Sequence, residues 1–554
     1  MDKQKVQKIN PYLSIALKKI PLLLSLEDRK TLSITYGCFD RNYWCWKFAD
    51  FAGSRFQEGV CALALLYTYD FQGNYLFKDK RILKWLLAGM EYWTKLCHRG
   101  GSFDEAYPYE QSLAATAFTA FYVGEAFLAL SNETPDILRK KLNDTFSQAG
   151  RWLCRNDEKH GILSNHLAAA AAALYDIYLI TGNGKFKERC NYFLQKIYAH
   201  QSDEGWFEEY GGADLGYQTL CSFFLAKIWQ HTKDELLLEK LEKSIEFLSY
   251  FVQPDSTISG EYASRNTEFY FPGAFEILAE KFAVARKIAQ FMKEGIESQK
   301  TAGLPAMDAY NFLPMLNNYI FTGLSAAVSE DTSQEPPLPF QRKFQKYYKE
   351  AGIYIKSSDK YYSIVGVSKG GIIKIFDKEK KTLLYSDCGY LMRSKNGAVS
   401  SSQSLDRSRI ASFSGDKIEL SSQFCEVSRG IFHPGSFILF RIFTLSLGRL
   451  PFFAYWVKCA LVKALVLKKK NISCALLRSV EFKDDQIHII DTIKDLVNAK
   501  PVFLLRCDKF TTIHMGSSQY FQKSELDAEY FKDVNLLKDI SDKKLVKFEK
   551  TINF

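Results

Sequence analysis

The chain has 554 residues, of which 47% are hydrophobic and 15% aromatic. This length is too great for one ordinary hydrophobic core and predicts two domains, and the composition excludes a disordered chain. The net charge of +10 is divided unevenly, because the first 340 residues carry −5 and the remainder +15. A basic surface is therefore expected in the C-terminal part, where nucleic acid, anionic lipid and acidic polysaccharide all fit the excess.

Twelve cysteines are scattered singly along the chain without a CxxC pair. This usage indicates free thiols in a reducing compartment and gives no basis for a zinc site. Residues 1–30 hold an apolar piece, but lysines interrupt it and no small-residue cleavage site follows. We therefore expect a cytoplasmic protein, with no metal and no cofactor.

Between Arg55 and Val328 the sequence predicts helices with apolar residues at helical spacing, joined by loops rich in Gly, Asp, Asn and aromatic residues. Small-residue, apolar helices recur about 40 to 60 residues apart, which is the spacing of a helical-hairpin repeat. They are expected at 55–70, 110–130, 164–180, 213–229, 266–280 and 308–323.

More charged helices follow them, as at 136–156 and 234–252. Buried inner helices that alternate with amphipathic outer helices predict a closed α/α toroid of five to seven hairpins, with an open helical solenoid as the alternative. Closure is favoured because Ala, Gly and Ser on the inner helices allow close approach. In a toroid, the loops that lead into the inner helices all open on one face.

The fold class predicted is multidomain α and β, with an N-terminal (α/α) toroid of helical hairpins and a C-terminal antiparallel β-sandwich. The toroid is expected over residues 1–328, a polar and proline-rich linker over 329–341, and the sandwich over 342–554. The sandwich is interrupted by an apolar, basic segment at 437–470. We expect two long core strands there. The alternative is a surface that rests on an anionic membrane, with Phe452, Phe453, Tyr455 and Trp456 at the interface.

The loops that enter the inner helices carry the candidate site residues. Any one loop could be structural, since Asp and Ser cap helices and Arg pairs with Glu. Five loops that converge on one face, however, favour a binding cleft. The candidates for substrate binding in these loops are Arg41, Trp44, Arg55, Glu105, Tyr109, Trp206, Glu209, Tyr210, Tyr262 and Asn266.

Asn165, His166, Tyr217 and Arg265 have a shared chemical logic. Elimination across the C4–O4 bond of a uronic acid requires removal of the C5 proton, which is too weakly acidic unless the neighbouring carboxylate is neutralised. An Asn amide, an Arg or a protonated His can stabilise the charge that develops there. A Tyr or His can take the proton, and a Tyr can return one to the leaving oxygen.

The domain plan, with an Asn-His pair that opens a small-residue helix, resembles the heparinase II/III-type polysaccharide lyases and, more distantly, the chondroitin and hyaluronate lyases. The Asn-Asn-His stretch of the first group is matched here by Ser164-Asn165-His166. Their later "DG…E…Tyr" loop is similar to residues 203–217, although the spacing here is longer. The arginine that the chondroitin-type enzymes place after that loop is matched loosely by Arg265.

The resemblance implies that Asn165 neutralises the carboxylate and that Tyr217 is the base or acid, with His166 and Arg265 assisting. It also implies a cleft histidine from the β domain, for which His433 is the candidate. The chain departs from the chondroitin-type pattern, which has a His shortly after the DG turn where this sequence has Glu208, Glu209 and Tyr210. The expected partner is an acidic polysaccharide or oligosaccharide, met during synthesis of a surface glycan at the inner membrane face.

Two other functions fit the same sequence. A glycoside hydrolase would draw its acid and its base or nucleophile from Asp104, Glu105, Glu110, Glu209 and Asp214. A non-catalytic glycan-binding protein of a membrane-associated assembly would keep the toroid, but the side chains of Asn165, Tyr217 and Arg265 would not converge. Nucleic-acid binding is not expected, because no recognised motif accompanies the basic excess.

Overall fold

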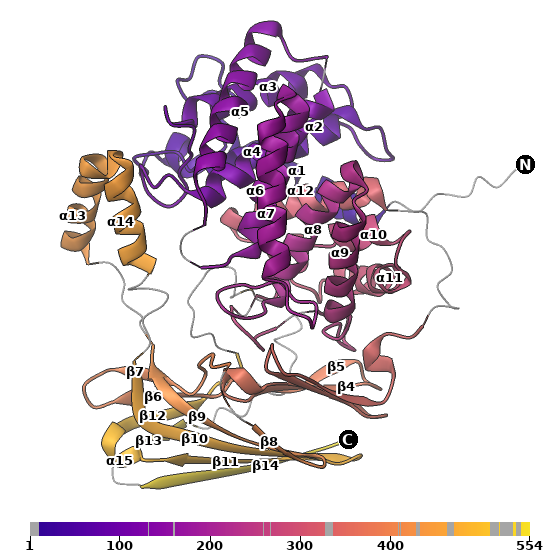
Figure 1. The fold of residues 1–554 in the computed structure, drawn as a ribbon, viewed down its shortest axis with the longest axis vertical. Coiled ribbons are helices and arrows are strands. Elements are labelled where there is room, and N and C mark those ends of the chain that lie inside the picture. Colours follow the sequence, from indigo (N-terminus) through magenta and orange to yellow (C-terminus); the bar gives the residue numbers. More distant parts are fainter. Residues whose placement is uncertain are drawn as a thin grey trace, which may run out of the picture.

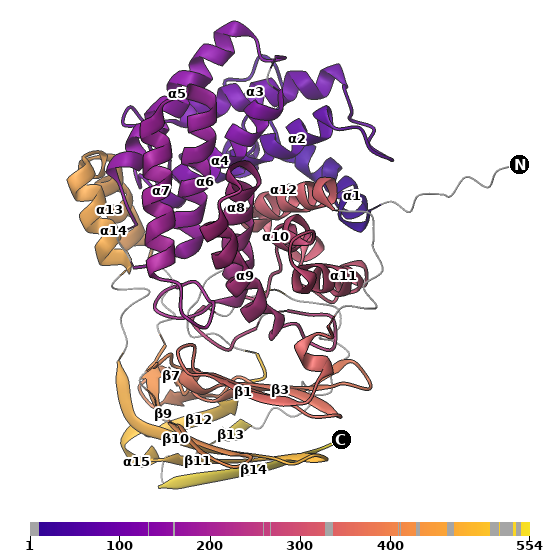
Figure 2. The same ribbon diagram turned by 45° about the vertical axis from the view of Figure 1, so that its right-hand side comes forward.

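The structure is a computed structural model with helices in the first part of the chain and strands in the second (Figures 1 and 2). It describes residues 10–130, 132–158, 161–258, 260–265, 267–326, 336–407, 409, 411–427, 433–462, 470–509, 520, 536–538 and 544–554. The predicted fold class, a helical toroid followed by antiparallel β-sheets, is confirmed.

Within the described residues, six inner helices form a closed ring. Each packs against the next, and α12 packs against α2 as well as α10, so the toroid is closed and the open solenoid is wrong. The alanines of 168–173 are buried in this ring, where small side chains let neighbouring helices approach closely. The inner helices are α2 (Gly59–Thr68), α4 (Leu113–Leu130), α6 (Ser164–Thr181), α8 (Leu215–Thr232), α10 (Gly273–Leu278) and α12 (Ala309–Ser325). The inner helix expected at 266–280 is therefore much shorter than predicted.

Six amphipathic helices lie outside the ring. Four helices of the toroid begin after an Asp that caps them, namely α3, α8, α9 and α12. The outer helices are α1 (Pro11–Leu26), α3 (Lys80–Leu96), α5 (Asp136–Arg155), α7 (Gly184–Ala199), α9 (Glu235–Ser249) and α11 (Ala283–Glu297). Helix α1, which the sequence analysis did not identify, packs against α11 and α12, so the first helix of the chain completes the last hairpin.

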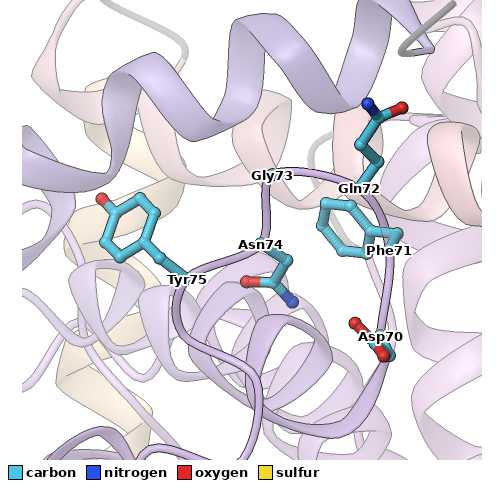
Figure 3. A pocket seen from close by; sticks show the side chains of 6 residues that line it. All are labelled: Asp70, Phe71, Gln72, Gly73, Asn74 and Tyr75. Atoms are coloured by element: carbon cyan, nitrogen blue, oxygen red, sulfur yellow. The ribbon is translucent and has the colours of Figure 1, made fainter. Parts of the chain in front are cut away.

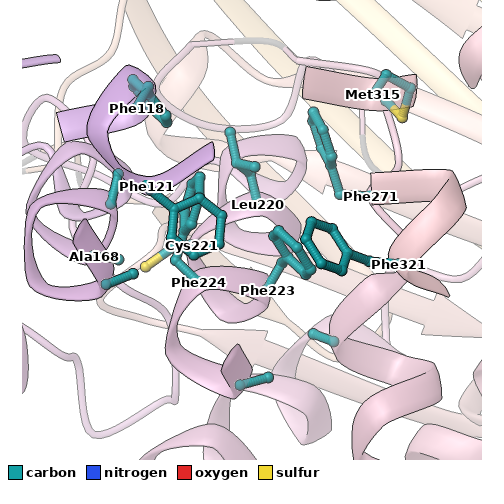
Figure 4. Packing of buried hydrophobic residues seen from close by; sticks show 14 of the residues in the cluster. Phe118, Phe121, Ala168, Leu220, Cys221, Phe223, Phe224, Phe271, Met315 and Phe321 are labelled. Atoms are coloured by element: carbon teal, nitrogen blue, oxygen red, sulfur yellow. The ribbon is translucent and has the colours of Figure 1, made fainter. Parts of the chain in front are cut away.

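Phenylalanines from different inner helices fill the middle of the ring (Figure 4). The Phe121 and Phe224 rings are 5.0 Å apart, and those of Phe223 and Phe321 are 5.8 Å apart. Among the described helices, α4 is long and apolar enough to cross a membrane, but 83% of it is buried inside this core. The toroid therefore has a packed centre, and α4 is a core helix.

A five-stranded antiparallel sheet packs directly under the toroid. Its strands, in spatial order, are β1 (Phe344–Tyr348), β2 (Ile353–Ser357), β3 (Tyr361–Gly366), β4 (Ile372–Asp377) and β5 (Thr382–Asp387). Ile355 and Ile364 belong to the toroid's hydrophobic core, whereas their neighbours Tyr354 and Val365 join a second core on the opposite face. Because side chains alternate along a strand, this sheet is buried on both faces and forms the middle of three layers.

The outer layer is a nine-stranded sheet in the order β13-β12-β6-β7-β9-β10-β11-β14, with β8 paired to β9. Its strands are β6 (Tyr390–Ser394), β7 (Val399–Ser401), β8 (Ala411–Ser414), β9 (Lys417–Glu426), β10 (Asn471–Phe482), β11 (Gln486–Lys494), β12 (Pro501–Arg506), β13 (Leu536–Lys538) and β14 (Leu545–Asn553). Of the expected linker, residues 329–335 lie outside the described residues. The remainder contains a short 3-10 turn, Pro339–Gln341, in which Phe340 is buried.

The apolar segment at 437–470 is helical rather than extended over its described part. Helices α13 (Pro434–Leu445) and α14 (Pro451–Val462) form a hairpin inserted between β9 and β10, and residues 463–469 lie outside the described residues. Because β9 and β10 pair directly with each other, the sheet has no position between them for further strands. The two expected core strands are therefore wrong, and Figure 1 shows the helices beside the toroid.

The toroid and the β domain are joined by polar contacts as well as by the shared core. Lys374 Nζ on β4 lies 2.5 Å from Glu261 and 3.8 Å from Glu268, both in the loop before α10. Glu204, in the loop before α8, accepts hydrogen bonds from the backbone N–H groups of Glu350 and Ala351, at 2.8 and 2.9 Å. These contacts hold the loop face of the toroid against the sheets.

Glycines with positive φ let three loops pack against the backbone of outer helices. A Cβ atom at Gly37, Gly101 or Gly205 would lie 2.2 to 2.3 Å from a carbonyl oxygen of α3, α5 or α9, respectively. At Gly205, whose φ is 101°, that oxygen belongs to Lys243. Each of these loops requires glycine for both its backbone conformation and its close approach.

We expect Gly205→Ala to lower the free energy of unfolding by about 2–4 kcal/mol, through overpacking and left-handed strain together. Gly211→Ala is the matched control, because Gly211 also has a positive φ, 80°, but a Cβ there would meet open space. The control should cost about 1 kcal/mol. Chemical denaturation of the two variants measures the difference, and equal losses would contradict the packing argument.

Candidate active site

The loops that precede the inner helices are hydrogen-bonded to one another at one end of the toroid. The backbone N–H of Ser54 donates to Asp104 O at 3.0 Å, that of Ser164 to Glu208 O at 3.2 Å, and that of Ser264 to Ala213 O at 2.8 Å. Side chains from loops far apart in sequence are thereby brought together, as the toroid prediction requires.

Three of the four residues predicted to be catalytic gather around Glu209. Asn165, in the first turn of α6, donates a hydrogen bond from Nδ2 to Glu209 Oε1. Arg265, from the loop before α10, places a guanidinium nitrogen 3.7 Å from the same oxygen. The Arg265 guanidinium also lies 3.9 Å from the ring centroid of Tyr217 and 5.1 Å from that of Tyr210. The side chains of Asn165, Tyr217 and Arg265 therefore converge.

Three members of this cluster are fully buried. Asn165, Glu209 and Arg265 expose 0%, 2% and 3% of their surface, whereas Tyr210 and Tyr217 are half-buried. Burial raises the pKa of Glu209 to about 8, against the opposing effects of Arg265 and Asn165. Glu209 is thus a mainly protonated carboxyl group at neutral pH, and the two tyrosines are the members of the cluster that reach the surface.

Local backbone geometry fixes the positions of Tyr210 and Tyr217. Asp214 caps α8 by accepting a hydrogen bond from the N–H of Tyr217 at 2.9 Å, and it also accepts one from the Thr267 hydroxyl. Tyr210 has a positive φ of 52° and donates its N–H to Ile162 O at 3.1 Å. A left-handed tyrosine is strained, and such strain is concentrated at functional sites in proteins.

His166 follows Asn165 but points to a different partner. Its Nδ1 lies 2.8 Å from Glu158 Oε2, and its ring meets Phe118 edge-on, with centroids 5.8 Å apart. The side chain is 21% exposed, whereas that of Glu158 is 4% exposed. The buried carboxylate orients the imidazole and leaves Nε2 for another partner.

Arg55 shares the ring of Phe118 with His166. Its guanidinium lies 4.2 Å from the centroid of that ring, forms an ion pair with Glu58 and lies 3.3 Å from Glu105. Burial raises the pKa of Glu58 to about 7, although the Arg55 charge opposes this. Phe118 therefore connects the loop before α2 with the start of α6.

The helical hairpin of the β domain, residues 434–462, reaches this acidic loop region. Lys458 Nζ on α14 lies 3.4 Å from Glu110 Oε1. Burial by itself lowers the pKa of Lys458, but Glu110, Glu158 and Glu105 outweigh it and raise the value above normal. Lys458 is therefore held as a cation close to the carboxylate that orients His166.

Several residues predicted to bind substrate lie elsewhere. Trp206 is buried and donates Nε1–H to Glu204 at 3.1 Å, next to the domain junction. Tyr262 is fully buried, and its hydroxyl accepts a hydrogen bond from Gln253 at 3.1 Å. The structure does not bring either residue to the cluster around Glu209.

Arg41 and Trp44 donate hydrogen bonds to the carbonyl oxygens of Ser25 and Leu26, both at 2.7 Å, and so tie their loop to the end of α1. His433 is exposed and caps α13 by accepting the Gly435 N–H at 3.2 Å. Asn266 lies outside the described residues.

Four of the five carboxylates considered for hydrolysis pair with cations or backbone N–H groups, and the fifth, Glu209, is buried against Asn165 and Arg265. Asp104 pairs with His98 at 2.7 Å and accepts the N–H groups of Tyr109 and Gln111 at 2.6 and 2.8 Å. Glu110 is bound by Lys458, Glu105 by Arg55, and Asp214 caps α8. Each of these four therefore has a structural partner in the folded protein.

Three residues of the site region were missed by the sequence analysis: Phe118, Glu158 and Lys458. Phe118 is in an apolar helix and has the pattern of a core residue, Glu158 is one acid in a charged loop, and Lys458 is in the segment expected to form strands. A carboxylate eight residues before a histidine at the start of a helix was the one available signal, and it is weak.

Three hollows among the described residues, at residues 70–75, around Tyr385 and around Lys395, lie away from this cluster. The turn between α2 and α3, residues 70–75, surrounds an open depression of about 570 Å³ (Figure 3). Asn74 there donates to the carbonyl oxygens of Leu66 and Tyr69 at 2.7 and 2.8 Å, as a turn residue does. Within the described part of the chain, no group of three or more His, Cys, Asp or Glu residues could hold a metal ion, and none of the twelve cysteines forms a disulfide.

The raised pKa of Glu209 gives a prediction for stability against pH. The folded protein keeps a proton on Glu209 that the unfolded chain releases above a pKa of about 4.3, so the contribution of Glu209 to stability falls as the pH rises from there to about 8. Glu209→Gln stays neutral throughout. Between about pH 5 and pH 8, the free energy of unfolding of Glu209→Gln should therefore rise relative to that of the wild type by on the order of 3 kcal/mol.

Denaturant titrations at several pH values measure this difference. Glu208→Gln is the matched control, because that neighbouring carboxyl is part-exposed beside His200. Parallel curves for Glu209→Gln and the wild type would show instead that Glu209 is ionised in the folded protein, paired with Arg265.

Comparison with known proteins places this geometry in a structural context. Residues 43–274 match the family model described as the Ulvan lyase N-terminal domain. This range covers the loops of Arg55, Asn165, Tyr217 and Arg265. A comparison with curated proteins finds no match.

Among solved structures, the chain is similar to the chondroitin AC lyase of Streptomyces coelicolor A3 in complex with chondroitin sulphate, with a TM-score of 0.53 and 9% identity over 91% of this chain and 69% of that one. It is also similar to a Paenibacillus xanthan lyase, with a TM-score of 0.52 and 8% identity over 91% of this chain. It spans about half, 47%, of the length of the xanthan lyase. The α/α toroid followed by β-sheets is therefore a fold shared with polysaccharide lyases, whereas the finer assignment to the heparinase II/III type stays a prediction.

Proposed function

We propose that the protein is a polysaccharide lyase that cleaves a uronic-acid-containing glycan by β-elimination. The observation that carries this proposal is the convergence of Asn165, Arg265 and Tyr217 around Glu209 at the loop face of a lyase-type toroid. The match of residues 43–274 to the ulvan lyase domain supports it, because that range contains all three residues.

Tyr217 is the proton-transfer group in this proposal. Its half-buried phenol is at the surface of the cluster, and the Arg265 guanidinium, 3.9 Å from its ring, stabilises negative charge on the phenol oxygen. In this step Tyr217 starts as the phenolate and becomes a phenol as it takes the proton from C5 and the C5–H bond breaks. The electron pair forms the C4=C5 double bond, the C4–O4 bond breaks, and the phenol returns the proton to O4.

His166 neutralises the uronate carboxylate. Its imidazole is 21% exposed and is held by the buried Glu158 through Nδ1. In this proposal Nε2 carries the second ring proton and donates a hydrogen bond to an anionic oxygen of the substrate. A cation at this point stabilises the charge that moves onto the carboxylate when C5 loses its proton. In this proposal His166, rather than Asn165 as the resemblance implies, neutralises the carboxylate.

Asn165 and Glu209 form the buried part of the cluster and act on Arg265. Both are fully buried, and the Asn165 amide is committed to Glu209. Because Glu209 is mainly protonated at neutral pH, the Arg265 charge is not cancelled and remains available to Tyr217. The pair therefore positions Arg265, and its loss should lower turnover through that arginine.

The competing functions have less support. Asp104, Glu105, Glu110 and Asp214 are engaged in caps and ion pairs, which weakens the case for a glycoside hydrolase. A purely structural glycan-binding protein does not require the three side chains to converge. Action at the cytoplasmic face of the membrane, during synthesis of a surface glycan, stays a prediction from the sequence.

The test is to incubate the protein with a panel of uronic-acid polysaccharides and follow the ultraviolet absorbance of the C4–C5 unsaturated product. Tyr217→Phe and His166→Ala should each lower kcat by about 10²–10⁴-fold, the usual contribution of a proton-transfer or charge-stabilising group. Tyr75→Phe is the control, because Tyr75 is 62% exposed in the turn between α2 and α3.

Other outcomes would point elsewhere. New reducing ends without the chromophore, lost in Glu105→Gln, would establish hydrolysis. Glycan binding without cleavage, unchanged in Tyr217→Phe, would favour a binding protein.

A further inference from the structure

The hairpin of α13 and α14 exposes an unusual concentration of large apolar side chains. Ten of those exposed in the described chain lie within residues 437–456. Soluble proteins rarely expose contiguous apolar patches of this kind unless the patch binds something. The ten are Phe437, Ile438, Leu439, Ile442, Leu445, Leu447, Leu450, Phe452, Tyr455 and Trp456, exposed by 41% to 73%.

The exposure is not caused by a loosely placed hairpin, because the opposite side of the hairpin is fastened to the toroid. Arg441 Nε lies 3.0 Å from Asp50 Oδ2, and Lys458 lies 3.4 Å from Glu110. The Phe440 ring packs edge-on against Tyr107, with centroids 5.0 Å apart. These contacts direct one side of the hairpin inward and leave the apolar side in solvent.

The charge of the surrounding sequence indicates which kind of partner the exposed apolar face binds. Residues 427–470 contain eight Lys or Arg and no Asp or Glu. Two of the eight, Arg441 and Lys458, face the toroid. Arg449, in the turn between the two helices, is exposed, with its guanidinium 5.1 Å from the ring centroid of Tyr109. The sequence directly after α14 contains Lys463 and Lys468–Lys470. An exposed apolar face with basic residues and no acidic ones is complementary to an anionic lipid surface, which offers negative headgroups above an apolar interior.

The length of the helices fixes the mode of binding. Each has 12 residues and is therefore about 18 Å long, too short to cross a hydrocarbon core of about 30 Å. Phe452, Tyr455 and Trp456 lie on one short stretch of α14, and aromatic residues of this kind favour the boundary between headgroups and acyl chains. The hairpin is suited to lie in the interface rather than to span it.

We propose that the α13–α14 hairpin docks the protein onto an anionic lipid bilayer, with the apolar side chains of both helices inserted below the headgroups. The hairpin contacts the loops that contain Asp50 and Glu110, so docking brings this end of the toroid close to the membrane. The proposal does not depend on lyase activity.

The experiment is flotation of the full-length protein with vesicles of phosphatidylcholine alone or with added phosphatidylglycerol. The protein should float with the anionic vesicles and much less with the neutral ones, and added salt should weaken the binding by screening the headgroup charge. Phe452→Ser with Trp456→Ser, and Ile438→Ser with Leu439→Ser, should each weaken binding about tenfold or more, through the loss of inserted apolar area.

Ile137→Ser with Leu236→Ser is the matched control, because these residues are 78% and 45% exposed on outer helices of the toroid. Equal thermal unfolding of all three double variants shows that folding is intact. Light scattering without lipid tests whether a second copy covers the hairpin.

Two results would overturn the proposal. The first is equal binding of the hairpin variants and the control variant to anionic vesicles. The second is the absence of binding by the wild type, and a dimer that dissociates in the hairpin variants would then show that a second copy covers the hairpin.

Discussion

Closure of the inner-helix ring is the constraint on which the rest of the structure depends. Each inner helix is packed on both sides by neighbours, and α12 must meet α2, so small residues such as Ala168–Ala173 are required where the helices approach. Closure also brings the connecting loops to one end. Asn165 and Glu209 are 44 residues apart in sequence, and Glu209 and Arg265 are 56 apart. They are nevertheless in contact, because closure of the ring places consecutive loops side by side.

The β domain completes that end of the toroid. Its first sheet is buried on both faces, with alternate residues of β2 and β3 in the toroid core and in the sandwich core. Separation of the two domains would therefore expose apolar surface on both. Lys374 and the Glu204 carboxylate add directional contacts to the loops before α8 and α10, the same loops that supply Glu209 and Arg265. The geometry of the site is thus maintained partly from outside the toroid.

Features that depend on side-chain periodicity were predictable from the sequence, whereas features that depend on long-range contact were not. The inner helices and the β-sandwich belong to the first kind, because apolar spacing differs between helices and strands. The 437–470 segment belongs to the second, because a continuous apolar run has no period that separates a strand from a helix. Asn165, Tyr217 and Arg265 were identified from their loops, but the burial of Trp206 and Tyr262 depends on packing against other elements, which a single loop sequence does not show.

The position of the helical hairpin within the sheet has a further consequence. It leaves the sheet after β9 and returns in β10, where Cys425 and Asn471 are already paired, and an irregularity between Asn471 and Ala475 absorbs the change in direction. The two ends of the insertion are therefore fixed about 5 Å apart, as neighbouring strands are. The sheet register does not depend on what lies between them. The same scaffold can thus carry a longer, shorter or chemically different accessory segment without a change in the pairing of β9 with β10.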